Sequence, residues 1–308
     1  MSGRHEPVLL REALGFLRNG PGLYLDATLG DGGHAEALLD AEPEARLLGS
    51  DRDPAALAFA GERLRRFGAR VILARAAFRD LPELHRGQGG ELLAGALLDL
   101  GMSSRQLDDP ARGMSFQLEG PLDLRFDPGS DESAAERLRH VGEQELTQVL
   151  REHGGVDGAT RLARAMVAEA RAGRLLTTRA LAALVDRVSG GRAHPRRLAQ
   201  VFQALRIWIN DEARDLEAVL AWLPEAMRPG GVVVTLAYHS GEDRRIKRVV
   251  RGAPNPPPAR RRPPPSEARL PEEPWQELNH KVVTPTVEEK ARNPRARSAR
   301  LRAFRRTR

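Results

Sequence analysis

Three glycines close together, preceded and followed by acidic residues, are the first group in this chain that could bind a ligand. Gly30, Gly32 and Gly33 follow an apolar run that ends in Asp26, and Asp51 lies at the end of the next apolar run. A glycine turn between a strand and a helix lets a ligand approach the backbone, and an acidic residue about 20 positions later suits ribose hydroxyls. The pattern fits a dinucleotide and S-adenosyl-L-methionine alike, so the turn alone leaves the cofactor open.

The lack of lysine near the glycine turn and of cysteine in the whole chain limits the ligands and reactions that are possible. The first lysine of the chain is Lys247, so the glycine turn lacks the Gly-Lys-Ser/Thr of a phosphate-binding loop. The chain has no cysteine, which excludes disulfides, thiolate metal sites and a thiol nucleophile. Methylation at C5 of a pyrimidine passes through a thiolate adduct, so an exocyclic nitrogen or an oxygen remains as a methyl acceptor.

A second acidic strand end points to amine chemistry. Asp99 closes the apolar run of LLDLGMSS (97–104). A base amine is a weak nucleophile, and a carboxylate that accepts its N–H would orient it and offset the charge that develops on transfer. The alternative for Asp99 is a strand-end cap. Asp26 has two interpretations as well, a ligand for a methionine amino group or a brace for the turn.

Short apolar runs that alternate with helical patterns predict a doubly wound α/β sheet. After Leu100 the pattern changes to a loop-rich stretch and then to nearly a hundred helical residues, in which Thr177 or Thr178, Gly190 and Pro195 mark helix ends. One long helix is expected from Pro195 onward. The expected strands are 23–28, 45–51, 69–76, 94–100 and 230–240, with a final pair at 280–286 and 297–304.

The basic charge is concentrated near the end of the chain. Residues 251–308 hold 15 Lys and Arg against 6 Asp and Glu, within a net charge of +7. Such a tail favours contact with a polyanion such as RNA, although arginine use throughout the chain offers a compositional explanation. Arg295, Arg297, Arg300 and Arg302 would alternate along the last strand. Arg206 and Asn210, one helical turn apart, could face RNA or brace the loop at 101–127.

Together the motifs resemble one family, the bacterial S-adenosylmethionine-dependent methyltransferase H of small-subunit ribosomal RNA, which methylates N4 of a cytidine in the decoding region. The resemblance spans nearly the whole chain. It rests on HEPVLL (5–10), DATLGDGGH (26–34), DRDP (51–54), LLDLGMSSRQLDD (97–109), RGMSF (112–116), GPLDLRFD (120–127), FQALRIWIN (202–210), HSGEDR (239–244) and NPRARSARLR (293–302).

The resemblance implies a Rossmann-like class I methyltransferase sheet with an inserted helical subdomain. The expected bounds are 1–108 for the first part of the core, 109–225 for a substrate-recognition insertion, and 226–308 for the second part. Composition predicts a mobile Pro- and Arg-rich segment at 252–274, where the chain departs from the family's pattern. The resemblance implies S-adenosyl-L-methionine as the cofactor and no metal. The implied cofactor ligands are Gly32, Gly33, His34, Asp51, Phe78, Asp99 and Gln106.

We expect direct attack by the amine, with Asp99 orienting it and Tyr238 or Phe116 packing the base. Tyr238 stands in AYHSGEDR (237–244), where the family commonly has SFHSLEDR, and it keeps an aromatic face. His239, Glu242 and Asp243 resemble metal ligands only weakly. The expected partner is the ribosomal RNA or a ribosomal particle in the cytoplasm, with no membrane, and a homodimer stays open. The competing functions are an NAD-dependent oxidoreductase and a non-catalytic RNA-binding assembly factor.

Overall fold

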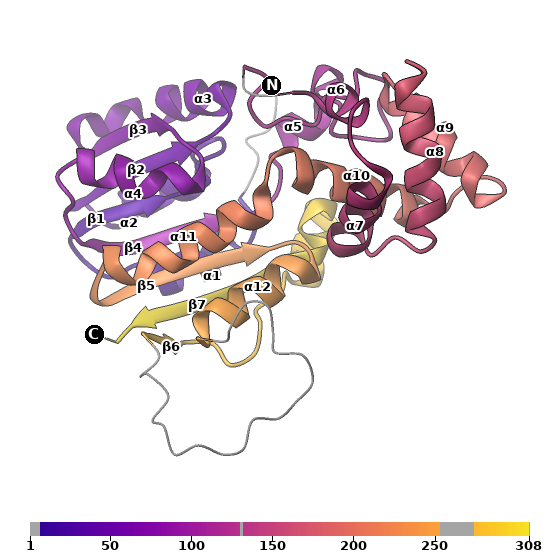
Figure 1. The fold of residues 1–308 in the computed structure, drawn as a ribbon. Coiled ribbons are helices and arrows are strands. Elements are labelled where there is room, and N and C mark those ends of the chain that lie inside the picture. Colours follow the sequence, from indigo (N-terminus) through magenta and orange to yellow (C-terminus); the bar gives the residue numbers. More distant parts are fainter. Residues whose placement is uncertain (1–6, 130–131, 253–273, 308) are drawn as a thin grey trace, which may run out of the picture. The chain divides into compact units, whose positions relative to one another are not determined.

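The computed structural model describes residues 7–129, 132–252 and 274–307 (Figure 1). They fall into two compact units, the first made of Met1–Gly101 with Asp215–Arg308 and the second of Met102–Arg214. The sequence predicted an insertion at 109–225. Most of the Pro- and Arg-rich segment expected at 252–274 lies outside the described residues.

The first unit is built on a seven-stranded sheet in the order β3-β2-β1-β4-β5-β7-β6. Strands β1 to β5 run parallel, and β7 lies antiparallel to both β5 and β6. The strands are β1 (Gly22–Asp26), β2 (Ala45–Asp51), β3 (Val71–Arg75), β4 (Leu93–Asp99), β5 (Met227–Ala237), β6 (Trp275–Glu277) and β7 (Arg300–Arg306).

Helices cover both faces of this sheet, as its apolar strands require. One face packs on α1 (Leu10–Leu17), α2 (Gly33–Ala41) and α3 (Pro54–Leu64). The other packs on α4 (Leu81–Gly87), α11 (Glu212–Ala226) and α12 (Ser240–Val250). The remaining elements of the unit are η1 (Arg65–Arg70), η2 (Phe78–Asp80), α13 (Val287–Arg292) and η4 (Pro294–Ser298). The α/β fold is thus the predicted one.

The prediction of a final pair of strands at 280–286 and 297–304 is half wrong. Residues 300–306 form β7, but 280–286 contributes only an isolated bridge between Val283 and Leu301. Pro285 lacks the N–H that a ladder needs, and Thr286 already caps α13. The edge strand beside β7 is β6 instead.

The arginines expected to alternate along the last strand do not share one face. Arg295 and Arg297 lie in η4, before β7 begins. Arg302 is buried, and its Nε donates to Asp243 Oδ1 at 2.6 Å. This part of the basic tail therefore includes a buried structural ion pair.

The second unit is mostly helical and has a core of its own, which Leu146, Leu162 and Leu205 help to form. Thr177 caps α9, Gly190 ends it, and Pro195 opens α10, as the sequence predicted. Its elements are α5 (Ser104–Asp108), η3 (Pro110–Arg112), α6 (Ala134–Leu138), α7 (Glu143–Gly154), α8 (Ala159–Arg171), α9 (Thr178–Ser189) and α10 (Pro195–Ile209).

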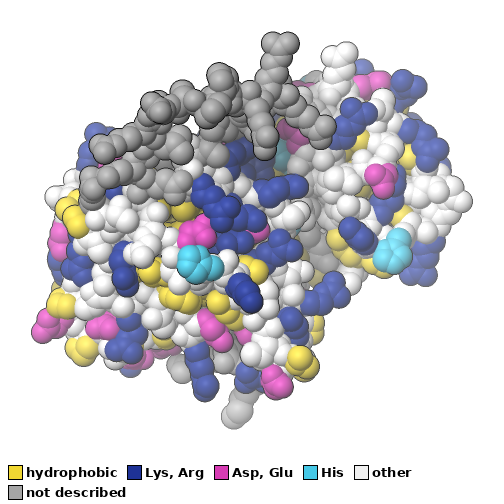
Figure 2. Space-filling model, turned by 90° about the horizontal axis from the view of Figure 1, so that it is seen from below, with side chains coloured by type: hydrophobic (Ala, Val, Ile, Leu, Met, Phe, Trp, Pro, Cys, Tyr) yellow, Lys and Arg dark blue, Asp and Glu magenta, His cyan; other side chains and the backbone are white. Residues whose placement is uncertain are grey.

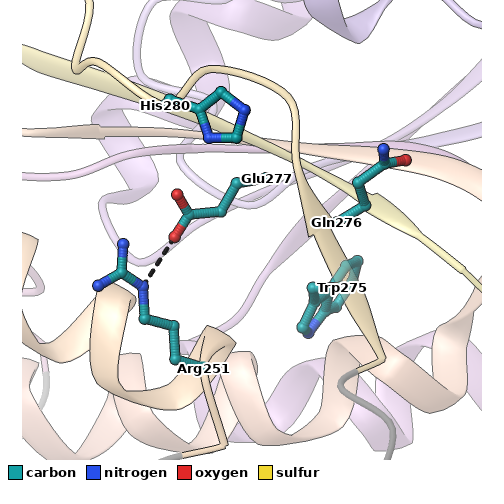
Figure 3. Close-up of a pocket in the computed structure, with 5 residues that line it drawn as sticks. All are labelled: Arg251, Trp275, Gln276, Glu277 and His280. Carbon is teal, nitrogen blue, oxygen red and sulfur yellow. Dashed lines mark hydrogen bonds and ion pairs between the residues drawn. The ribbon is translucent and has the colours of Figure 1, made fainter.

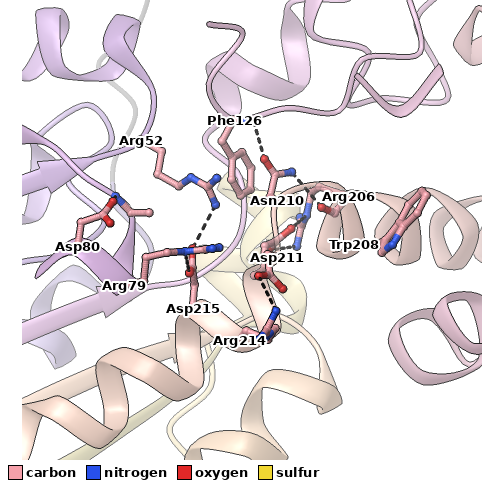
Figure 4. A network of polar contacts seen from close by, with 12 residues as sticks. Arg52, Arg79, Asp80, Phe126, Arg206, Trp208, Asn210, Asp211, Arg214 and Asp215 are labelled. Atoms are coloured by element: carbon pink, nitrogen blue, oxygen red, sulfur yellow. Dashed lines mark hydrogen bonds and ion pairs between the residues drawn. The ribbon is translucent and has the colours of Figure 1, made fainter. Parts of the chain in front are cut away.

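The single long helix expected after Pro195 is broken. Helix α10 ends at Ile209, and α11 starts at Glu212 after Asp211, whose φ is 52°. The buried Asn210 side chain donates to the Leu124 carbonyl and accepts the Phe126 N–H (Figure 4). Asn210 therefore braces the loop, one of the two roles predicted for it. None of the described helices is long and apolar enough to cross a bilayer.

Candidate active site

The glycine turn between β1 and α2 has the backbone that only glycine adopts without strain. Gly30 and Gly32 have φ of 50° and 75°, in the left-handed region. Gly33 is required for a different reason, because a Cβ there would lie 2.4 Å from Cγ of Pro7. The turn is thus packed against the N-terminal segment, a contact that the sequence did not predict.

Asp51, the expected ribose ligand, is fixed at the end of β2. Its Oδ2 accepts the N–H of Gly30 at 2.8 Å, and its Oδ1 accepts the N–H of Asp53 at 2.9 Å. Asp53 in turn caps α3 by accepting the N–H of Ala55. Each carboxylate oxygen has a second lone pair, so Asp51 retains the capacity to accept ribose hydroxyls.

Asp99 and Tyr238 meet at the carboxyl ends of the adjacent strands β4 and β5. The Tyr238 phenol donates to Asp99 Oδ1 at 2.9 Å. Burial raises the pKa of Asp99 to about 7, although the Tyr238 hydrogen bond lowers it. The side chain is still 23% exposed. The two predicted catalytic residues are therefore in direct contact, and Asp99 can exchange a proton near neutral pH.

His34 stands at the start of α2 with one ring nitrogen toward Asp99. Its Nε2 lies 3.2 Å from the Val8 carbonyl. A carbonyl oxygen only accepts, so Nε2 carries the hydrogen and Nδ1 keeps a lone pair. Burial lowers the pKa of His34 to about 4. A neutral Nδ1 thus faces Asp99 Oδ2 at 3.8 Å.

Three carboxylates, those of Asp26, Asp51 and Asp99, lie at the carboxyl ends of β1, β2 and β4 without a Lys or Arg partner among the described residues. Asp26 accepts the N–H of Thr28, so it does brace the turn. Burial, and to a smaller extent the charges of Asp99 and Asp51, raises the pKa of Asp26 to about 7. Within the described ranges no Lys or Arg pairs with any of the three. Uncompensated negative charge of this kind favours a cationic ligand.

The carboxylates do not make a metal centre. Over the described part of the chain, no group of three or more His, Asp or Glu side chains could hold a metal ion. The HSGEDR motif has a structural role instead. His239 caps α12, and Glu242 Oε2 accepts the N–H groups of Tyr238 and His239. This cap fixes the backbone of Tyr238, a function that the capping-box spacing could have revealed.

Phe78 lies in η2 after β3, is half-buried, and packs against the core of the first unit. Its neighbour Arg79 donates to Asp215 Oδ1, and Arg52 donates to Asp215 Oδ2 at 3.3 Å (Figure 4). The buried Asp215 thereby ties the loop after β2 to the loop after β3. The sequence reasoning missed Asp215 because the pairing spans 136 and 163 positions.

Two predicted residues belong to the second unit. Gln106 is buried, and its Oε1 accepts the Ser103 N–H in the capping box of α5. Phe116 packs edge-to-face on Phe202, with ring centroids 5.8 Å apart. Their roles toward the cofactor and the base stay predictions.

A separate pocket of about 410 Å³ lies at β6 and the end of α12 (Figure 3). Arg251, Trp275, Gln276, Glu277 and His280 line it. Arg251 and Glu277 pair with each other at 2.9 Å. No predicted site residue lines this pocket, and the chemistry described above lies at the strand ends.

The open α/β sheet, with its glycine turn and acidic strand ends at one edge, is the arrangement expected of a Rossmann-like class I methyltransferase, and sequence comparison identifies the chain as one. The sequence model of the MraW methylase family matches residues 2–307. "Ribosomal RNA small subunit methyltransferase H" of Thermomicrobium roseum is 45% identical over 98% of this chain and 94% of its own. The protein of the same name from Sorangium cellulosum is 40% identical over 98% and 91%.

The chain belongs to the MraW methylase family. Its cofactor is S-adenosyl-L-methionine, which decides between the two cofactors that the glycine turn left open.

Proposed function

We propose that this protein transfers a methyl group from S-adenosyl-L-methionine to N4 of a cytidine in the decoding region of small-subunit ribosomal RNA. Family membership and the names of the relatives support the RNA substrate. The observation that carries the amine chemistry is the contact between Tyr238 and Asp99 at the edge that also holds Asp26 and Asp51.

The residues fit this cofactor. When bound, S-adenosylmethionine supplies a methyl group on a positively charged sulfonium, next to an ammonium. The carboxylates of Asp26 and Asp99 lie in a buried setting that favours such charge. Gly32 and Gly33 would contact the cofactor through their backbone, His34 lies beside them at the start of α2, and Asp51 keeps lone pairs for the ribose. Phe78 would pack the adenine.

Asp99 would orient the amine. Tyr238 occupies Oδ1, which leaves Oδ2 to accept an N–H from the exocyclic amine. Held in this way, the amine nitrogen would accept the methyl group that bound S-adenosylmethionine would supply, with the S–C bonding pair left on the sulfur of the product. The extra proton passes from nitrogen to Asp99 Oδ2. A pKa near 7 lets Asp99 take this proton and return it to water.

The basic surface of the first unit supports an RNA partner. Helix α12 and its C-cap carry five cationic side chains within eight positions: Arg244, Arg245, Lys247, Arg248 and Arg251. Figure 2 shows Lys and Arg side chains gathered near the middle of the face it presents. Since α12 begins two residues after Tyr238, phosphates bound along it would lead toward the proposed catalytic edge. Free RNA and an assembled particle are both candidate substrates, the expected place is the cytoplasm, and a homodimer stays open.

The test is methyl transfer in vitro. The protein is incubated with methyl-labelled S-adenosylmethionine and with unmethylated small-subunit RNA, either free or in particles, and the RNA is digested to nucleosides. We expect label in N4-methylcytidine. Label in any other nucleoside, or saturable NAD binding in place of S-adenosylmethionine binding, would overturn the proposal. Transfer to neither substrate would revive a non-catalytic RNA-binding role.

A further inference from the structure

A strained leucine next to the site is held by a side chain from the far end of the sequence. Leu9 has φ of 52° and ψ of 36°, which is left-handed backbone for a residue that is not glycine. This conformation is strained and persists only when the surroundings enforce it. The Leu9 side chain is buried, and its N–H donates to Glu289 Oε1 at 2.7 Å.

The preceding residue connects this strain to the site. The carbonyl of Val8 lies 3.2 Å from His34 Nε2 and so fixes the ring tautomer. On the other side, Pro7 packs where a Cβ of residue 33 would stand. A short segment, Pro7–Leu9, therefore forms a layer behind the glycine turn and holds the ring of His34 in one orientation.

The orientation matters because it creates a pair of acceptors. His34 Nδ1 and Asp99 Oδ2 lie 3.8 Å apart, too far for a hydrogen bond between them. Burial keeps His34 uncharged by lowering its pKa to about 4. Two lone pairs at this separation can accept the two N–H groups of one primary amine. The target amine on cytosine has these two groups.

We propose that Glu289 is a positioning residue for methyl transfer: by accepting the Leu9 N–H it directs the Val8 carbonyl onto His34 Nε2, so that His34 Nδ1 and Asp99 Oδ2 together hold the target amine. Its role in turnover rests on the proposed function. The arrangement of Glu289, Leu9 and His34 is a property of the protein alone and can be tested without substrate.

The experiment reads the His34 tautomer by nitrogen-15 NMR of histidine-labelled protein, with His34→Asn to assign the signal. The unchanged protein should show the Nε2–H form. Glu289→Gln should keep it, because the amide oxygen still accepts from Leu9. Glu289→Ala should give a mixture of tautomers, and kcat should fall about ten- to a hundredfold, as for a misplaced reacting group.

The control is Glu288→Ala, the exposed neighbour on α13, which should change neither the tautomer nor kcat. If Glu289→Ala does not fold, Glu289→Asp keeps the charge but shortens the reach and should show the same tautomer mixture. A folded Glu289→Ala or Glu289→Asp with a single Nε2–H tautomer would overturn the proposal. If the tautomer changes as expected while the unchanged protein methylates nothing, the proposed function and the role of Glu289 in turnover fail, and only the orientation of His34 by Glu289 stands.

Discussion

The phenol of Tyr238 donates a hydrogen bond to the carboxylate of Asp99 across two adjacent parallel strands, at 2.9 Å. The bond fixes one carboxylate oxygen and leaves the other toward His34. It also lowers the pKa of Asp99 against the larger effect of burial, which raises it to about 7. Tyr238 is thus placed to tune the pKa of Asp99, and its packing against a base stays a prediction.

Tyr238→Phe should shift the pH dependence of the reaction. Without the phenol the ionised form of Asp99 loses a hydrogen bond, so its pKa rises further. The acidic limb of kcat against pH should move upward by about one pH unit, the effect of losing a charge-assisted bond. Asp99→Asn should abolish that limb and lower kcat by about a hundredfold or more. An unchanged limb in Tyr238→Phe would show that Asp99 does not act as proposed.

Binding of the cofactor near neutral pH should release protons. Asp26 and Asp99 are partly protonated at pH 7 because burial raises the pKa of each to about 7. A cationic ligand favours the ionised carboxylates and lowers both pKa values. Affinity should therefore increase as the pH rises from about 6 to 8. Titration calorimetry in buffers of different ionisation enthalpy counts the protons, and proton uptake would contradict the account.

In the protein without ligand, the same carboxylates should make stability fall as pH rises. Their folded pKa values near 7 lie above the unfolded value of about 4, so the folded state binds more protons between these values. Their contribution is complete below about pH 4 and is lost through pH 7. His34 has the opposite sign, since its folded pKa of about 4 costs stability below pH 6.5. In urea unfolding, the double variant Asp26→Asn, Asp99→Asn should show a smaller decline in stability between pH 4 and 7; what remains includes Asp51, whose pKa burial also raises.

Asp215→Asn should weaken cofactor binding. The change removes the charge that holds Arg52 and Arg79, so the loops that carry Asp51 and Phe78 lose their shared anchor. We expect Kd for S-adenosylhomocysteine to rise about tenfold, with kcat at saturation nearly unchanged. Glu217→Gln, two positions later on α11 and paired with Arg245 and Arg248 on α12, is the matched control. Equal Kd values for both variants would contradict this role.

Asp243→Ala should destabilise the fold strongly, although the change removes only a carboxylate group. Asp243 and Arg302 are both buried. Burial alone would raise the pKa of Asp243, but the hydrogen bonds from Arg302 and Lys247 hold this pKa below its usual value. Removing one partner leaves a buried, uncompensated arginine, at a cost of about 3 to 5 kcal/mol. Lys247→Ala, which removes a more exposed partner, should cost under about 1 kcal/mol. Urea denaturation compares the free energies of unfolding of the two variants. Similar losses in both would contradict a stabilising role for the buried pair of Asp243 and Arg302.

The sequence predicted most of the fold because its signals are local. The apolar run at 45–51 forms β2 with these bounds, and the N-cap Thr177 and the first-turn Pro195 stand where the side-chain types indicated. The run at 280–286 misled because Val283 sits in an apolar stretch that Pro285 ends before a ladder can form. The break at Asp211 depends on the Asn210 contacts with a distant loop, which no helical periodicity reveals.

The site residues also divide into those that local sequence signals predict and those that depend on contacts with distant parts of the chain. Asp51, Asp99 and Tyr238 were predicted because they end strands, and parallel strands bring their ends to one edge. Asp215 and Glu289 could not be found by spacing, since each acts on residues more than a hundred positions away. Val8 contributes only a backbone carbonyl, so its side-chain type carries no signal.

Nucleoside mass spectrometry of small-subunit ribosomal RNA from cells with and without this protein tests N4-cytidine methylation most directly. We expect N4-methylated cytidine to be lost without the protein, restored by the unchanged chain, and not restored by Asp99→Asn produced at the same level. Persistence of N4-methylated cytidine without the protein, or full restoration by Asp99→Asn, would contradict the account.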